Sequence, residues 1–544
     1  MAFANVTKNV KLFKFGKIGE LKFFKKILDS LREFTENKYM DNDLLFILTY
    51  MASLSTAQLN RDKIFEMAAS RKEYAPSKYF KKVINLTKNW HYDYATACKL
   101  VAESIKHERV KKLFNRLANA IEAGEPDREV LENEWKVFKT VRKDEYLRSL
   151  ESLRKWTDAY VSILVSTTLI SVVVLLAVVI YSSTDPILTS FSSVLASLAF
   201  SLFGVFMLFK AVPKDAKTHD LEIKSKEQSI ISRLQKLLLP IFVIVLFIFS
   251  IIPAVINPEA KLFGVSMIGL GLILSGLVIL PLGIFGWIDD KKISKRDEAF
   301  TAFIRSVGSI VAGAGVSIAE ALSRIDQKNL GELKDLVLKL HRRLSMGLDP
   351  KLSWEKFIGE SGSYLINKLT KIFVDAADLG GDTDKIGEIV SSSNLEMVLL
   401  RLKRNLISSG FVNLVIPLHA AMIGLLLFIT RVLNRFTTLV STMFASQMSS
   451  LGGASNIFSK IPISGLNLGL FGGVPIDMLT RYALAVSLIL TFANTLAMKI
   501  VKGGANYFIY FYGGILLIIS GVLMTVVPPM VDWMFALPSF LEGG

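Results

Sequence analysis

Acidic side chains gather beside two glycine-containing turns, one in each half of the chain. In chain order they are Glu122, Glu125 and Asp127 at the first turn, and Asp375, Asp378, Asp382 and Asp384 at the second. Paired carboxylates can act in general acid–base catalysis or supply oxygen ligands to a cation. Their neighbours are polar, so solvated carboxylates beside a turn are the simpler interpretation. We predict no catalytic residue and no metal site from them.

The sequence contains no motif for nucleotide hydrolysis. A P-loop needs a glycine-rich loop followed by Lys and Ser or Thr, and neither glycine-rich turn, Gly313–Gly315 or Gly380–Asp382, is followed by them. Both are typical of turns that end helices. The single cysteine, Cys98, excludes an intramolecular disulfide or a cysteine-based zinc site. We therefore predict no cofactor and no enzymatic activity of the chain by itself.

Basic residues form two clusters that could bind an acidic partner in a chain of formal net charge +16. The predicted partner-binding residues are Lys210, Lys214, Lys217, Lys224, Lys226, Arg233 and Lys236 in one cluster, and Lys291, Lys292, Lys295 and Arg296 in the other. Alternatively, these charges only set membrane orientation and attract anionic lipid. No basic, aromatic-interleaved module typical of nucleic-acid binding is found, so we expect no nucleic-acid partner.

The two clusters border apolar segments that are long enough to cross a membrane, which takes about 20 residues. Seven such segments lie at 160–181, 187–209, 237–256, 262–286, 410–429, 479–498 and 507–531. Their connections alternate between many and few Lys and Arg residues, which predicts a cytoplasmic N-terminus and an extracellular C-terminus. His419 interrupts the fifth segment, where a lone histidine usually hydrogen-bonds a neighbouring helix.

We expect an all-α integral membrane protein, because the remaining stretches show helical spacing of apolar residues. The predicted organisation is a basic N-terminal segment (1–40), a first cytoplasmic helical domain (41–156), four spans (160–286) with a basic cytoplasmic loop (210–236), a second cytoplasmic helical domain (287–408), and three spans (410–544) with an external loop (431–478).

An internal repeat indicates that the two cytoplasmic domains are duplicates. The segment SLSTAQLN (53–60) aligns with IVAGAGVS (310–317), and AIEAGEPDREVL (120–131) aligns with AADLGGDTDKIG (376–387). Between these anchors, Asp93 and Asp349 each precede a new helix, as N-caps would. Three anchors in the same order favour a duplicated domain. The first copy departs at Gln58, which stands where the second has Gly315.

The repeated segments ASLSTAQLNRDKIFEMA and SIVAGAGVSIAEAL resemble the F domain of type II secretion and type IV pilus systems. Two such domains with extra membrane helices look like the archaeal branch of this family, above all the archaellum assembly platforms. The resemblance covers about residues 40–530.

The resemblance implies a platform without catalytic activity that couples a hexameric secretion ATPase on the cytoplasmic side to filament assembly or rotation. It implies pilin-like or archaellin-like subunits in the membrane as further partners, and a homodimer. A platform for an adhesive pilus or a secretion system is an alternative. A membrane transporter is a third interpretation, disfavoured because no Asp, Glu, Lys or Arg lies deep in the first four spans.

Overall fold

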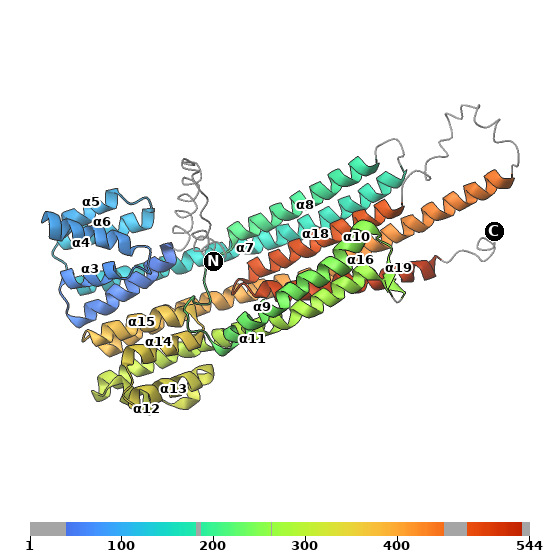
Figure 1. Cartoon of the computed structure of the whole chain (residues 1–544). Coiled ribbons are helices and arrows are strands. Elements are labelled where there is room, and N and C mark those ends of the chain that lie inside the picture. Colours follow the sequence, from blue (N-terminus) through green and yellow to red (C-terminus); the bar gives the residue numbers. More distant parts are fainter. Residues whose placement is uncertain (1–39, 181–185, 263, 451–475, 536–544) are drawn as a thin grey trace, which may run out of the picture. The chain divides into compact units, whose positions relative to one another are not determined.

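The computed structural model describes residues 40–180, 186–262, 264–450 and 476–535 (Figure 1). The predicted N-terminal segment, apart from Met40, and most of the predicted external loop lie outside these residues. The described chain forms two compact units that divide between Phe138 and Lys139. This division falls inside one continuous helix, α7 (Asp127–Ile180). The predicted domain limits at 156 and 408 remain predictions.

The first unit is a bundle of helices around an aromatic core. Its elements are a helical stretch over 40–54, η2 (Ser55–Ala57), α3 (Arg61–Ser70), α4 (Ser77–Trp90), α5 (Tyr94–Glu103), α6 (Glu108–Glu122) and the start of α7. Phe80 lies between Phe65 and Phe114, with ring centroids 5.5 Å and 4.8 Å away. Burying such side chains stabilises each by roughly 1.5–3 kcal/mol, so this cluster holds α3, α4 and α6 together.

The second unit contains the remaining helices and one small hairpin. Its elements are the part of α7 from Lys139 onward, α8 (Pro186–Ala211), α9 (Lys226–Leu246), a π-helical turn (Phe247–Ile251), α10 (Ile252–Ile256), β1 (Lys261–Leu262), β2 (Val265–Ser266), α11 (Met267–Ala314), α12 (Ile318–Arg324), η4 (Gln327–Leu333), α13 (Lys334–Ser345), α14 (Pro350–Ser361), α15 (Tyr364–Asp378), α16 (Thr383–Ser450), α18 (Ile476–Lys502) and α19 (Phe508–Met534). The strands β1 and β2 pair antiparallel.

Seven helices of the described chain are long and apolar enough to cross a membrane, which confirms the predicted number of spans. Three of them also extend far beyond their apolar segments: α7, α11 and α16 contain 54, 48 and 68 residues. Pro417 does not end α16. At about 1.5 Å per residue, each of these helices is much longer than the roughly 30 Å hydrocarbon layer.

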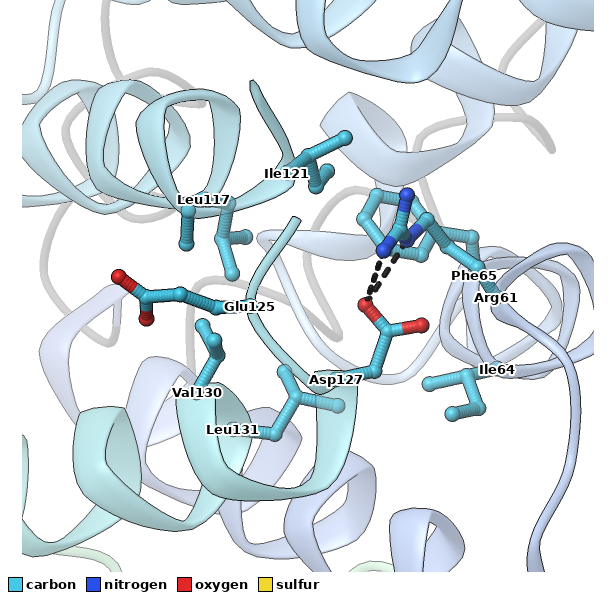
Figure 2. Close-up of a pocket in the computed structure, with 10 residues that line it drawn as sticks. Arg61, Ile64, Phe65, Leu117, Ile121, Glu125, Asp127, Val130 and Leu131 are labelled. Carbon is cyan, nitrogen blue, oxygen red and sulfur yellow. Dashed lines mark hydrogen bonds and ion pairs between the residues drawn. The ribbon is translucent and has the colours of Figure 1, made fainter. Parts of the chain in front are cut away.

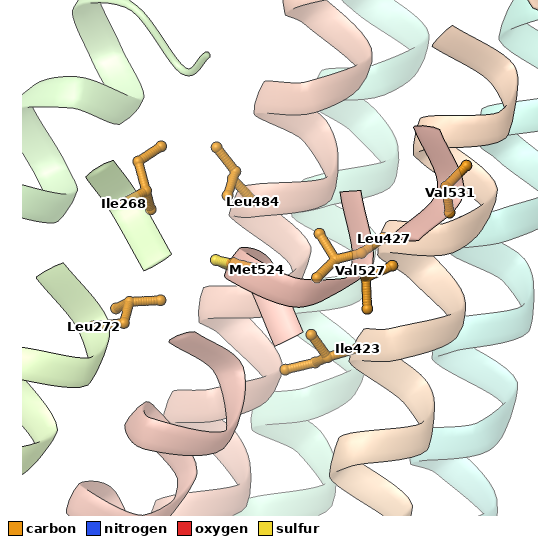
Figure 3. Close-up of a cluster of buried hydrophobic side chains, with 8 residues drawn as sticks. All are labelled: Ile268, Leu272, Ile423, Leu427, Leu484, Met524, Val527 and Val531. Carbon is orange, nitrogen blue, oxygen red and sulfur yellow. The ribbon is translucent and has the colours of Figure 1, made fainter. Parts of the chain in front are cut away.

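The spans of the second unit pack through an apolar cluster that four helices share (Figure 3). Ile268 and Leu272 come from α11, whereas Met524, Val527 and Val531 come from α19. The other members are Ile423 and Leu427 of α16 and Leu484 of α18. Since lipid tails are as apolar as these side chains, close fit rather than exclusion from water supplies the stabilisation.

Glycines let α11 and α19 approach each other closely. A Cβ atom added at Gly514 would lie 3.2 Å from the carbonyl oxygen of Gly276, and one at Gly521 would lie 2.6 Å from that of Gly269. These positions therefore tolerate no larger side chain without separating the two helices.

His419 hydrogen-bonds neighbouring helices, as predicted. Its Nε2 lies 3.0 Å from the Ser520 hydroxyl and its Nδ1 lies 2.9 Å from the Asn494 amide nitrogen. Asn494 also accepts a bond from the Tyr160 hydroxyl at 2.9 Å. The chain thus satisfies these buried polar groups with one another, which accounts for His419 without a transport role.

Candidate functional site

Four segments of the second unit meet where its membrane helices join the second helical domain. They are the connection between α8 and α9 (212–225), the middle of α11, the middle of α16, and the end of α18 with the turn to α19 (500–507). We call their charged and polar contact set the charged junction; it consists of Asp215, Lys217, Asp289, Asp290, Asp297, Arg401, Arg404, Lys502 and Tyr507.

Arg401 of α16 lies at the centre of the charged junction. Its guanidinium donates to Asp215 of the α8–α9 connection at 2.6 Å and to Asp297 of α11 at 2.7 Å. The exposed fractions of the three side chains are only 11%, 6% and 2%. A guanidinium shared by two carboxylates has a fixed direction as well as strong hydrogen bonds. Arg401 therefore fixes the connection and α11 to α16.

Asp297 accepts a further hydrogen bond that keeps this buried carboxylate in place. Ser363, the N-cap of α15, donates its hydroxyl to Asp297. Burial raises the pKa of Asp297, which lies beyond the predicted span, to about 6, and the neighbouring Arg401 opposes this rise. The carboxylate is consequently ionised at neutral pH, where it balances Arg401.

Arg404 connects α16 to the end of α18. Its guanidinium donates to the backbone carbonyls of Ile500 at 3.0 Å and Val501 at 3.2 Å, and to that of Pro213 at 3.1 Å. The last carbonyls of a helix have no partner inside the helix. A buried arginine that supplies these donors fixes the sixth span to α16.

Two adjacent carboxylates of α11 complete the charged junction. Asp290 forms an ion pair with Lys217 at 2.6 Å. Asp289 accepts from Ser225 at 3.1 Å, from Gln228 at 3.3 Å and from the Tyr507 hydroxyl. Asp289 therefore joins α9, α11 and the start of α19 through one fully buried carboxylate.

The α8–α9 connection is also bound to the second helical domain through its backbone. The amide of Tyr364 donates to the Lys217 carbonyl at 3.0 Å, and His219 Nε2 lies 3.1 Å from the Gly359 carbonyl oxygen. Burial lowers the pKa of His219, and its bond to Gly359 partly offsets this shift. The imidazole is therefore neutral at physiological pH, so Nδ1 can accept from the Leu221 amide at 3.3 Å.

The predicted partner-binding residues separate into internal and exposed groups. Lys217 belongs to the charged junction, Lys292 pairs with Glu227 at 2.7 Å, and the buried Arg296 donates to the Ser361 carbonyl at 2.9 Å. Lys214 is half-buried. The exposed basic residues are Lys210, Lys224, Lys226, Arg233, Lys236, Lys291 and Lys295. Sequence reasoning treated all eleven as surface charges, because buried lysine and arginine are rare.

The carboxylates beside the glycine turns have structural roles in the described chain. In the first copy Asp127 accepts from Arg61 at 2.8 Å, whereas Glu125 points away from this pair (Figure 2). In the second copy Asp384 accepts from Ser309 at 2.5 Å. Each interaction connects the start of a long helix, α7 or α16, to its own domain. No group of three potential metal ligands occurs in the parts of the chain that the structure describes.

These observations define a helical, multi-pass membrane protein with a duplicated helical domain. Residues 47–175 and 303–430 each match the family described as type II secretion system (T2SS), protein F. Together the two matches cover just under half of the chain. The two matches confirm the duplication that the repeated segments predict.

Two curated relatives are similar over most of the chain. The Flagella accessory protein J of Methanocaldococcus jannaschii is 29% identical over 385 residues, which are 67% of this chain and 65% of that protein. The protein of the same name from Methanococcus voltae is 24% identical over 393 residues, or 68% of this chain and 66% of that protein. The similarity thus spans just under two thirds of the length of these relatives. No solved structure matches the chain.

Proposed function

We propose that this protein is the cell-membrane platform of an archaeal type IV pilus-like filament, and that this filament is the archaellum. The two F domains, the seven apolar helices and the name shared by both curated relatives support this proposal. In the proposed orientation the two helical domains and the N-terminus face the cytoplasm, and the C-terminus is extracellular. A reporter fused after Gly544 tests the orientation, and cytoplasmic activity of that reporter contradicts it.

The observation that carries the proposal is the continuity between the second domain and the membrane. α11 enters this domain and α16 leaves it as unbroken helices, and the two contact each other within the unit (Figure 1). Arg401 and Asp297 hold them together at the charged junction. A displacement of the domain is therefore transmitted to at least two spans. In the proposed mechanism a cytoplasmic secretion ATPase supplies this displacement, and filament subunits in the membrane respond to it.

Deletion of the gene, followed by electron microscopy and a swimming assay, tests the function. We expect cells without archaella that regain them when the intact gene is returned. Loss of adhesive filaments with normal swimming identifies the protein as the platform of an adhesive pilus instead. Normal numbers of every surface filament in the deletion strain contradict the proposal. Native mass spectrometry of the purified protein tests the expected homodimer.

The exposed basic residues beside the spans form the proposed docking surface for the ATPase. Lys224, Lys226, Arg233 and Lys236 lie on and before the first half of α9, and all four are exposed. Charges at the rim of an interface mainly accelerate association, and salt screens this effect. Changing these four residues to Glu should slow ATPase association and reduce its dependence on salt.

Two exposed lysines of the first domain, Lys72 and Lys112, provide the matched control. Lys72→Glu and Lys112→Glu change charge of the same sign outside the proposed docking surface and should leave association unchanged. If the α9 reversals insert normally and keep the association rate and salt dependence, this cluster only orients the chain in the membrane.

A further inference from the structure

Both helical domains present the same exposed turn between two helices. In the first domain Trp90 and Tyr92 flank His91 between α4 and α5, and we call these three residues the first tip. The second tip, between α13 and α14, consists of Met346, Gly347 and Leu348. The outer side chains are strongly exposed: Trp90 by 72%, Tyr92 by 44%, Met346 by 75% and Leu348 by 48%.

The middle residue of both tips is left-handed. His91 and Gly347 both have left-handed backbones, with φ of 55° and 73°. The amide of the next residue bonds to a carbonyl of the preceding helix in each case. The Tyr92 amide donates to the Leu86 carbonyl at 3.2 Å, and the Leu348 amide donates to the Arg343 carbonyl at 3.1 Å. A left-handed conformation is unfavourable for a residue with a Cβ atom, so its presence at His91 shows that the rest of the turn determines it.

An aspartate fixes the far side of each tip. Asp93 accepts from the Thr96 amide at 2.9 Å and begins α5, and Asp349 accepts from the Lys351 amide at 3.1 Å and begins α14. Although the residue types at the first three positions differ, both tips therefore have the same order. A large apolar residue, a left-handed residue and a second large apolar residue are followed by a capping aspartate. Two large apolar side chains held outward on a fixed turn are typical of an anchor for a partner.

The position of the second tip identifies the kind of partner. α14 runs antiparallel to α11, because Ser361 contacts Arg296 whereas Phe357 contacts Phe303, which lies farther from the spans. The tip is at the opposite end of α14 from Ser361, about 18 Å away for 12 residues. It is therefore directed away from the membrane helices, so a soluble protein rather than the bilayer is its partner.

Apart from the capping Asp93 and Asp349, the exposed charges beside the tips are basic, and this balance indicates an acidic partner. The helix before the first tip, α4, carries four lysines and no acidic residue. The helix before the second tip ends with Arg342 and Arg343, of which Arg342 is exposed, and Lys351 is exposed just after this tip. A partner that receives both tips needs at least two equivalent grooves, each apolar with an acidic rim. Repeated identical subunits supply such grooves.

We propose that the two tips dock in equivalent apolar, acid-rimmed grooves of a soluble homo-oligomeric protein. This inference rests on the proposed function, in which the secretion ATPase is that protein. It assigns the anchoring contact to the tips and leaves long-range attraction to the basic residues of α9.

Site-specific cross-linking tests which protein binds the tips. The native Cys98 does not have to be replaced for this experiment. Cys98 is fully buried, and burial raises its pKa to about 12, so its thiol reacts slowly with maleimides. Full-length Trp90→Cys and Met346→Cys proteins, labelled with maleimide–benzophenone in native membranes, are irradiated with the purified ATPase. Leu100→Cys, at an exposed apolar position of α5, is the control.

We expect both tip positions to form adducts with the ATPase and the control position to form few. Adducts of either tip with lipid, with a second copy of this chain or with a different protein contradict the proposal, as do adducts no more abundant than the control. If the unlabelled wild-type chain does not bind the ATPase at all, the proposed function fails, and the inference about the tips fails with it. Binding without tip adducts overturns only the inference.

Affinity measurements separate anchoring from a merely structural role. Trp90→Ala and Met346→Ala should each weaken ATPase binding by about tenfold or more, because anchor residues dominate interface energies. The triple change Trp90→Met, His91→Gly and Tyr92→Leu gives the first tip the residues of the second and should retain binding within about threefold of wild type. Normal affinity of both alanine variants, or loss of binding in the triple variant with intact helicity, contradicts the equivalence of the tips.

Discussion

The two helical domains share an order of helices but differ in their attachment to the membrane. In the first domain only the last helix, α7, continues into a span among the described residues. The second domain is entered by α11 and left by α16, which both continue into spans. Duplication thus supplied two similar bundles, and the second is connected to the membrane helices at both ends.

One pair of equivalent contacts shows how the second copy adapted to this position. In the first copy Asp41 contacts His107, the N-cap of α6, at 3.4 Å and pairs with Arg109 at 2.5 Å. In the second copy, one residue before the position that aligns with Asp41, Asp297 contacts Ser363, the N-cap of α15. Asp41 has 25% of its side chain exposed, whereas that of Asp297 is 2% exposed and pairs with Arg401. A partly solvated contact in one domain is therefore a buried connection in the other.

The largest expected difference comes from removing the arginine of each contact. Arg401→Ala leaves two buried carboxylates without their shared partner, which should destabilise the second domain by about 3–5 kcal/mol. Arg109→Ala removes a partly exposed pair and should cost about 0–1 kcal/mol. Hydrogen exchange of the full chain in detergent, followed separately for α14–α15 and for α5–α6, measures both losses. Equal losses would show that burial does not distinguish the two contacts.

A smaller difference is expected where helices cross. A Cβ atom at Gly308 of α11 would collide with the backbone carbonyl of Thr383 at the start of α16, whereas the aligned residue of the first copy is the buried Met51. Gly308→Ala should therefore destabilise the second domain by about 1–3 kcal/mol through overpacking. Gly313→Ala, at an open position of the same helix, is the control. The same exchange experiment detects the effect, and wild-type protection in Gly308→Ala would mean that the crossing adjusts freely.

Exchanging the residue types at Gln58 and Gly315 should change the stability of the two domains in opposite directions. Both residues have left-handed backbones, with φ of 52° and 62°, and this conformation costs a residue with a Cβ atom roughly 1–2 kcal/mol. Gly315→Gln should destabilise the second domain by about that amount. Gln58→Gly should stabilise the first domain slightly, because greater freedom of the unfolded chain offsets part of the gain. Thermal unfolding of the detergent-solubilised protein measures both, and a stabilised Gly315→Gln variant would contradict the equivalence of these turns.

The smallest effect concerns acidity at the α8–α9 connection, which has no counterpart in the first domain. The pKa of His219 is lower in the folded protein than in the unfolded chain. The contribution of neutral His219 to stability is therefore complete above the unfolded pKa of about 6.5, and it decreases as pH falls toward the folded pKa. The hydrogen-exchange protection factors of 213–225, which are corrected for the intrinsic pH dependence of exchange, should therefore decrease as pH falls from 7.5 to 5.5. His219→Asn should reduce this dependence; an unchanged dependence would assign it to another group.

The lengths and spacing of apolar segments and the repeated sequence segments were sufficient to predict the spans and the duplicated domains. The equivalence of Gln58 and Gly315 was harder to see, because glutamine rarely takes a left-handed backbone and only the surrounding turn imposes it. The charged junction was missed for a different reason. Its partners come from four distant segments, and nothing local distinguishes Lys217 or Arg401 from a solvated cation. The adjacent Asp289 and Asp290 at the end of a span were the one available signal.

The dependence of the charged junction on residues 500–507 has a consequence for biosynthesis. Arg404 and Asp289 receive partners from Ile500, Val501 and Tyr507, which a ribosome adds about a hundred residues after Arg404. At roughly 5–20 residues per second, Arg404 waits on the order of 5–20 s for these partners, and Asp289 waits about twice as long for Tyr507. The second domain is thus completed only after the sixth span has been synthesised, so a chain truncated before that point exposes unpaired charges that quality-control proteases can recognise.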